Sequence, residues 1–261
     1  MREWLLLLAV TLPMIALAQV SGSYYLFLFT ICLALGIPLL DPLLGRAVLS
    51  CLDVTWLPGG HPLSERMKAL APEQWRGNIR LGVIKGSPDS FTVSTGLRSR
   101  AIILTDGLLD LLDERELSSV LAHEIAHATR GHGLMRTLAF AIGLLNVPAG
   151  TALGAALCRK LEYEADELAV RTTGQPLDLA AALVKVTLSQ RNGGIRLPLG
   201  FAVPSRSLIS RLFSWTPPLE ERLRRIFRLA CDYGSCPDVL LVLGRGSQRW
   251  GEGPVDGDDL R

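Results

Sequence analysis

Residues 113–131 read DERELSSVLAHEIAHATRG, and they carry the marks of a single helix. Asp113 and Glu116 have the spacing of a capping box, which predicts that the helix begins there. Gly131 is a typical residue at a helix C-terminus, so the helix is predicted to run to that point. His123 and His127 lie four residues apart, so their rings project from one face, one turn above the other.

The pattern His-Glu-x-x-His at residues 123–127 indicates a metal site. Two imidazoles one turn apart can reach the same zinc ion, and Glu124 between them can take a proton from a water at the metal. The alternative is three unrelated polar residues on an amphipathic helix. The metal interpretation is favoured because the preceding residues, LSSVLA, are largely apolar, and a buried His-Glu-His cluster is costly unless something pairs with it.

A catalytic zinc needs three protein ligands and one open position, so a third ligand is expected downstream. Residues 161–169, LEYEADELA, predict a facing helix on which Glu162 and Asp166 share one face. Glu162 is predicted to be the third ligand of one Zn²⁺ per chain. Asp166 is predicted to bind the outward nitrogen of a ligand histidine and so to orient its ring. Glu164 is an alternative ligand, but it points away from that face; the other alternative is a solvated acidic helix.

A third histidine of the cluster, His132, follows the predicted end of the first helix. It lies beyond easy reach of a metal held by His123 and His127. A capping or surface role is therefore expected for it.

The remaining pattern from residue 53 onward is that of a mainly helical globular domain. Three strand-like runs, at 79–84, 90–95 and 101–104, are separated by turn residues and predict a small, mostly antiparallel sheet. Further helices are expected at 61–70, 159–173, 177–190 and 217–230. The fold class predicted for the chain is therefore α+β, mainly α.

The N-terminus contains two uncharged runs of 17 residues, 4–20 and 24–40, and the mean hydropathy of the chain is positive at +0.31. Each run is at the short end of what spans a bilayer, so residues 1–45 are predicted to form a transmembrane helical hairpin. Arg2 and Arg46 place both ends, and the domain at 53–230, on the cytoplasmic side of the inner (plasma) membrane. A cleaved signal peptide is the alternative for the first run, and it leaves that side unchanged.

A further uncharged run of 21 residues, 138–158, lies between the two halves of the predicted metal site. A single crossing of the bilayer would put His127 and Glu162 on opposite sides, which one shared ion forbids. The breaker sequence at 146–150, NVPAG, instead favours a re-entrant or interfacial hairpin. A hairpin buried in the protein core is the alternative.

The overall composition bears on nucleic-acid binding, on disulfide bonds and on order at the C-terminus. With 27 basic and 25 acidic residues, the net charge of +2 indicates no nucleic-acid binding. The five cysteines are odd in number and imply no disulfide framework, which fits a reducing compartment. Residues 244–261 are rich in glycine and charge and are predicted to be disordered. The sequence does not indicate the oligomeric state.

HExxH followed by ExxxD, with an apolar hairpin at the N-terminus, resembles the HtpX and CAAX prenyl protease family of integral-membrane zinc metalloproteases. The resemblance extends from residue 60 to residue 228. An Asn-Ala-Phe-like strand of the family is matched loosely by Asp89-Ser90-Phe91, followed by Gly96. A Thr-His-Pro-Pro stretch followed by an arginine is matched by residues 215–218 and Arg222.

One departure from the family pattern is at Thr216, where the Thr-His-Pro-Pro stretch has histidine. If that histidine stabilises the oxyanion in relatives, this chain must use Thr216 or another group. Thr216 and Arg222 are therefore candidates for an oxyanion-binding or a structural role.

The resemblance implies a membrane-anchored endopeptidase in which Glu124 is the general base and the substrates are membrane or misfolded proteins. A protein or peptide substrate is expected to pair with an edge strand, and Phe91, Thr92 and Val93 are the candidate residues of that strand. The alternative is a non-catalytic zinc-binding sensor or partner protein in the membrane. The intact Glu124 argues against it, because a structural metal site needs no general base.

Overall fold

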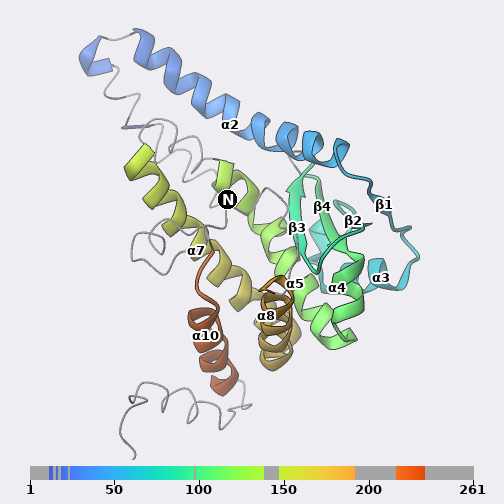
Figure 1. Ribbon diagram of the computed structural model, residues 1–261. Helices are drawn as coiled ribbons and strands as arrows, with labels where there is room; N and C mark the ends of the chain where they lie inside the picture. The colour runs from blue at the N-terminus through green and yellow to red at the C-terminus, as the bar shows by residue number, and fades with distance from the viewer. Residues whose placement is uncertain are drawn as a thin grey trace, which may run out of the picture.

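The computed structural model describes residues 24–96, 98–137, 147–191 and 216–232, together with positions 12, 13, 16 and 19–22. Its helices surround a four-stranded sheet (Figure 1). The α+β class, mainly α, is confirmed. The elements in chain order are α2 (Tyr24–Ser50), β1 (Thr55–Trp56), α3 (Pro62–Leu70), a 3-10 turn (Glu73–Trp75), β2 (Ile79–Ile84), β3 (Ser90–Ser94), β4 (Arg100–Thr105), α4 (Asp106–Leu111), α5 (Glu114–Arg130), α7 (Val147–Thr173), α8 (Pro176–Arg191) and α10 (Leu219–Asp232).

The sheet has the order β1-β2-β4-β3, which differs from the order of the strands in the chain. The β1–β2 and β3–β4 pairs are antiparallel, but β2 and β4 are parallel, so the sheet is mixed. All six residues of β4 are buried, and a strand with a continuous apolar run belongs in the centre of a sheet. The more polar β3 lies at the edge. The short strand β1 was not expected from the sequence.

Helix α5 is the centre of the molecule and has the predicted bounds. Asp113 and Glu116 form the capping box in full, and Gly131 ends the helix in the left-handed conformation, with φ of 68°. Leu121 and Ile125 belong to the core shared with the sheet, whereas Ala122 belongs to a second core shared with α7, α8 and α10. The helix therefore lies between the sheet and the helices α7, α8 and α10 (Figure 1).

Helix α7 begins earlier than the sequence indicated. The expected start near Arg159 is wrong, because the helix runs without a break from Val147 to Thr173. Pro148 lies in its first turn, where the missing N–H of proline costs no helical hydrogen bond. Residues 138–146, the other arm of the expected hairpin, and the tail 244–261 lie outside the described residues, so both remain predictions.

The second apolar run of the sequence lies in α2, which continues ten residues beyond its predicted end, to Ser50. Most of the first run lies outside the described residues. In the part of the chain that the structure describes, no helix has both the length and the hydropathy needed to cross a membrane. The C-terminal part of α2 packs on β3, where Arg46 Nε donates to the main-chain carbonyl of Thr95 at 2.8 Å.

Candidate metal centre

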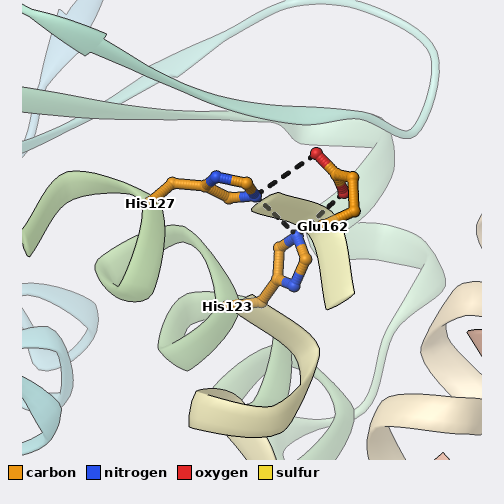
Figure 2. Close-up of side chains that lie close together, drawn as sticks. All are labelled: His123, His127 and Glu162. Atoms are coloured by element: carbon orange, nitrogen blue, oxygen red, sulfur yellow. Dashed lines mark hydrogen bonds and ion pairs between the residues drawn. The ribbon is translucent and has the colours of Figure 1, made fainter. Parts of the chain in front are cut away.

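Three buried side chains from two helices converge at one point (Figure 2). His123 and His127 project from α5, and Glu162 projects from α7, which packs along α5. One ligand atom from each of the three lies within 4.8 Å of the others. The helical period places the two histidines together, but only the packing of α7 on α5 brings the glutamate to them.

The distances between the ligand atoms suit a zinc ion. His123 Nε2 lies 3.1 Å from His127 Nε2, and the glutamate oxygens lie 3.6 Å and 3.4 Å from these two nitrogens. Ligands about 2.1 Å from a tetrahedral ion are themselves about 3.4 Å apart. Two imidazoles and a carboxylate are also the donor set of a catalytic zinc. The residues present therefore fit this metal.

Asp166 lies one turn beyond Glu162 on α7 and contacts the outward nitrogen of the first histidine. Its Oδ1 is 3.0 Å from His123 Nδ1, although the ring N–H does not point straight at this oxygen. Arg222 of α10 binds the same carboxylate through two hydrogen bonds, Nε to Oδ2 at 2.8 Å and Nη2 to Oδ1 at 2.6 Å. Arg222 Nη1 is also 3.6 Å from Glu162 Oε2. The arginine thus joins α10 to both acidic residues.

His132 is buried, with 2% of its surface exposed, so the surface role expected for it is wrong. Its Nδ1 is 2.7 Å from the Nδ1 of His127, the nitrogen that faces away from the candidate metal position. Gly131 takes the left-handed conformation and helical turns resume over 132–137, which brings this side chain to the site. His127 is therefore oriented by a neutral histidine, whereas His123 is oriented by a carboxylate.

Glu124 is buried, and β3 holds both of its carboxylate oxygens. The hydroxyl of Ser90 donates to Oε1 at 2.8 Å, and the hydroxyl of Thr92 donates to Oε2 at 2.7 Å. Phe91 and Val93 alternate with these residues and pack on the opposite face of the sheet, in a cluster around Ile103. Of the three predicted substrate-strand residues, only Thr92 thus turns its side chain toward the site.

A further arginine contacts the candidate third ligand. Arg136 donates to Glu162 Oε1 at 2.6 Å, so a charge-assisted hydrogen bond holds the candidate third ligand. Thr216 is exposed and lies three residues before α10.

The charges of the site influence one another strongly. Burial lowers the pKa of His123, but the neighbouring carboxylates of Asp166 and Glu162 outweigh burial and raise that pKa to about 9. Burial keeps the pKa of His127 well below its ordinary value. Burial raises the pKa of Glu162, yet His127, His123 and Arg222 outweigh it and hold it well below its usual range. Without a metal, Glu162 is thus ionised and His127 is neutral, which are the forms that bind a metal, whereas His123 is protonated at neutral pH and must lose that proton on binding.

The sequence did not indicate three of these partners: His132, Arg136 and the hydroxyls of β3. His132 was visible as the third member of the histidine cluster, but its distance past the helix end argued against a contact. Ser90 and Thr92 are two residues apart on a strand, so the sequence predicts that their hydroxyls lie on one face of the sheet. It does not predict which residues that face contacts.

A helix carrying HExxH and a facing helix that supplies a glutamate make up the site of a zinc metallopeptidase. The chain belongs to peptidase family M48, whose model matches residues 61–230. It is 31% identical over 180 residues to a protease HtpX homolog of Dictyoglomus thermophilum, across 54% of this chain and 59% of that protein. It is 32% identical over 196 residues to a protease HtpX homolog of Kineococcus radiotolerans, across 55% of this chain and 64% of that protein.

The fold is also similar to a solved structure. The crystal structure of S. mikatae Ste24p superposes with a TM-score of 0.56 at 16% sequence identity, covering 84% of this chain and 61% of that one. At this identity the similarity concerns the fold alone. In each of these comparisons the chain matches about three fifths of the length of its relative.

Proposed function

We propose that this chain is a membrane-anchored, zinc-dependent endopeptidase that hydrolyses peptide bonds of membrane or misfolded proteins near the cytoplasmic face. The observation that carries the proposal is the convergence of His123, His127 and Glu162 beside Glu124. Family membership and the names of the relatives agree with a protease. The membrane anchor rests on the two uncharged runs at the N-terminus.

The residues of the site have separable tasks in this reaction. His123, His127 and Glu162 would hold one zinc ion, which supplies a Lewis acid that polarises a peptide carbonyl and acidifies water. Glu124 would accept the proton of the attacking water and deliver it to the leaving amine. Asp166 and His132 would keep the two imidazole rings in the orientation needed for binding. Thr216 and Arg222 stay candidates for an oxyanion-binding or structural role.

In the part of the chain that the structure describes, no strand pairs with the outer edge of β3, which supports binding of an extended peptide there. At the two ends of the β3–β4 pair, Asp89 accepts a main-chain hydrogen bond from Thr105, and Thr95 donates one to Ser99. In an antiparallel pair the inward and outward residues alternate, so Ser90 and Thr92 turn their main-chain groups to the free edge. A peptide chain adding to this edge would gain main-chain hydrogen bonds without a demand on its sequence.

Helix α2 limits this edge at one end. The main-chain oxygen of Ser94 lies 1.9 Å from the point where a Cβ on Gly45 would stand, so the two backbones are in close contact. A peptide paired at Ser90 and Thr92 would therefore meet α2 at Ser94 and continue only in the other direction.

The test pairs zinc content with cleavage of casein in detergent, for the wild type and three variants. Glu124→Gln should keep about one zinc and lose about 10² to 10⁴ in rate, because the general base is removed but no ligand is. Glu162→Ala should lose both metal and activity. Glu164→Ala is the matched control, since it removes the other candidate glutamate of α7, and it should keep both. Zinc retained by Glu162→Ala would show that the third ligand is misassigned.

The second candidate function is a non-catalytic zinc-binding membrane protein, and the specific observation in its favour is Thr216 at the histidine position of the family pattern. A wild-type protein that holds zinc but cleaves neither casein nor membrane-protein substrates would favour it.

A further inference from the structure

We infer that Ser90 and Thr92 are positioning residues that fix the carboxylate of Glu124 and tie it to the strand edge where the peptide pairs. This inference rests on the proposed function, because it assigns a task within that reaction. Glu124 lies on α5 and the two hydroxyls lie on β3, 34 and 32 residues away in the sequence, so tertiary packing alone makes the contact.

The two hydroxyls bind different oxygens of the same carboxylate. Ser90 Oγ donates to Oε1 at 2.8 Å and Thr92 Oγ1 donates to Oε2 at 2.7 Å, so both ends of the group are held. Hydrogen bonds to an ionised carboxylate are stronger than those between neutral groups. Each carboxylate oxygen has two acceptor positions, so each can accept a further proton while it accepts from its hydroxyl. The two bonds therefore restrict the orientation of Glu124 without blocking its use as a base.

Thr92 is well suited to this task because its side chain is branched at Cβ and has few rotamers. Its Oγ1 also lies 3.2 Å from the main-chain oxygen of Glu124, next to the stronger contact with the carboxylate. The contact therefore reaches both the backbone and the side chain of the general base. Ser90 stands where the Asn-Ala-Phe pattern has alanine, so its hydroxyl is a feature of this chain.

The same two residues face the peptide-binding edge with their main chains. The register of β3 turns the backbone groups of Ser90 and Thr92 away from β4, while their side chains reach Glu124. The Ser90 N–H is already bound by Asp89 Oδ1 at 2.9 Å, whereas within the described residues the carbonyl of Ser90 and both main-chain groups of Thr92 are open to a peptide. A peptide paired at these residues would lie in a fixed position relative to Glu124. The same two residues would bind the peptide through their main chains and Glu124 through their hydroxyls.

The experiment removes the hydroxyls and keeps the strand. Ser90→Ala, Thr92→Val and the double variant are compared with the wild type for kcat and KM on a fluorogenic peptide and for bound zinc. We expect kcat to fall about 10-fold in each single variant and about 100-fold in the double variant, as for a displaced catalytic group. KM and zinc content should stay at the wild-type values, because neither the main-chain edge nor a metal ligand changes. Thr92→Ser, which restores the hydroxyl, should recover most of the rate.

The matched control is Thr55→Val, the same chemical change on β1 at the opposite edge of the sheet. It should leave kcat unchanged. The inference is overturned if the double variant keeps the wild-type kcat, if kcat falls only together with zinc content, or if Thr92→Ser is as slow as Thr92→Val.

A readout that does not need turnover separates this inference from the proposed function. The infrared carboxylate band of Glu124 is obtained as the difference between the wild type and Glu124→Gln. This band should shift in the double variant and stay in place in Thr55→Val. If the wild type cleaves nothing but the band shifts, the proposed function fails while the hydroxyls still hold the carboxylate. An unshifted band overturns the inference whatever the activity.

Discussion

The outward nitrogen of His127 is held by one neighbour, His132, at 2.7 Å. For Nε2 of His127 to bind a metal, its Nδ1 must carry the proton and donate it to His132 Nδ1. The proton of His132 then resides on its own Nε2, which is buried and has no hydrogen-bond partner in the described part of the chain. The neutral His132 thus orients the ring of His127, as Asp166 orients the ring of His123.

We expect His132→Ala to weaken zinc binding about 10-fold to 100-fold, because the ring of His127 loses the contact that orients it at Nδ1. Competition with a chromophoric chelator measures this affinity. His61→Asn is the control, because His61 caps α3 through its Nδ1 and asparagine can replace that cap. Equal zinc affinity of His132→Ala and the wild type would contradict the assigned role.

The same histidines predict how acid affects the metal-free protein. Burial and Arg136 lower the pKa of His132 to about 3 in the folded state, against an ordinary value of 6.5. The unfolded chain therefore binds more protons below pH 6.5, and folding stability falls as pH decreases, by at most about 1.4 kcal/mol per pH unit for each such group. His127 acts in the same direction. The pKa of His123 is raised in the folded state, so below pH 6.5 this residue is protonated in both the folded and the unfolded chain. Its contribution to folding stability is therefore constant there and does not oppose this trend.

Urea unfolding of the metal-free protein at several pH values below 6.5 measures this loss of stability. His132→Ala should reduce the slope, because it removes one of the groups that take up a proton on unfolding. If the free energy of unfolding falls with pH as steeply in this variant as in the wild type, other groups cause the acid sensitivity.

Among the elements, α2 and β3 lie in close backbone contact. A Cβ on Gly45 would stand 1.9 Å from the Ser94 carbonyl oxygen, and a backbone atom cannot rotate away. We expect Gly45→Ala to destabilise the protein by about 1 to 3 kcal/mol. Thermal unfolding in detergent measures the change.

Gly36→Ala is the matched control on the same helix, since a Cβ there meets nothing within 4 Å. Alanine is the better helix former by about 1 kcal/mol, so this variant should be as stable as the wild type or more stable. Equal effects of the two substitutions would mean that α2 does not pack on β3 as described.

Helix α10 is joined to the site by Arg222, whose side chain is only 13% exposed and lies against two carboxylates. We expect Arg222→Met to cost about 3 to 5 kcal/mol in free energy of unfolding, because Asp166 and Glu162 would lose their buried partner. Arg224→Met removes an exposed pair with Glu220 on the same helix and should cost less than about 1 kcal/mol. Urea denaturation compares the two, and similar losses would argue against a buried ion-pair network.

Across the whole molecule, the candidate metal joins α5 to α7, the two helices in the most extensive contact with each other. Bound zinc at 100 times its dissociation constant should stabilise the fold by about 2.7 kcal/mol. EDTA should therefore lower the melting temperature of the wild type. Glu162→Ala should melt at the same temperature with and without the chelator; a shift as large as that of the wild type would place the metal elsewhere.

The local features of this protein follow from its sequence. The bounds of α5, its capping box and its terminal glycine depend on residues within one or two turns, so pattern alone predicts them. The proximity of His123 and His127 follows from the period of the helix, and the strands at residues 79–84 and 90–94 were found from their composition.

Only the tertiary structure decided which distant residues meet. The parallel pairing of β2 with β4, the return of His132 after Gly131, and the reach of Arg222 to Asp166 across 56 residues depend on how elements pack. The contact of the β3 hydroxyls with Glu124 is of the same kind. A short-range pattern determines which face a side chain occupies, but the burial of apolar surface between elements determines what that face meets.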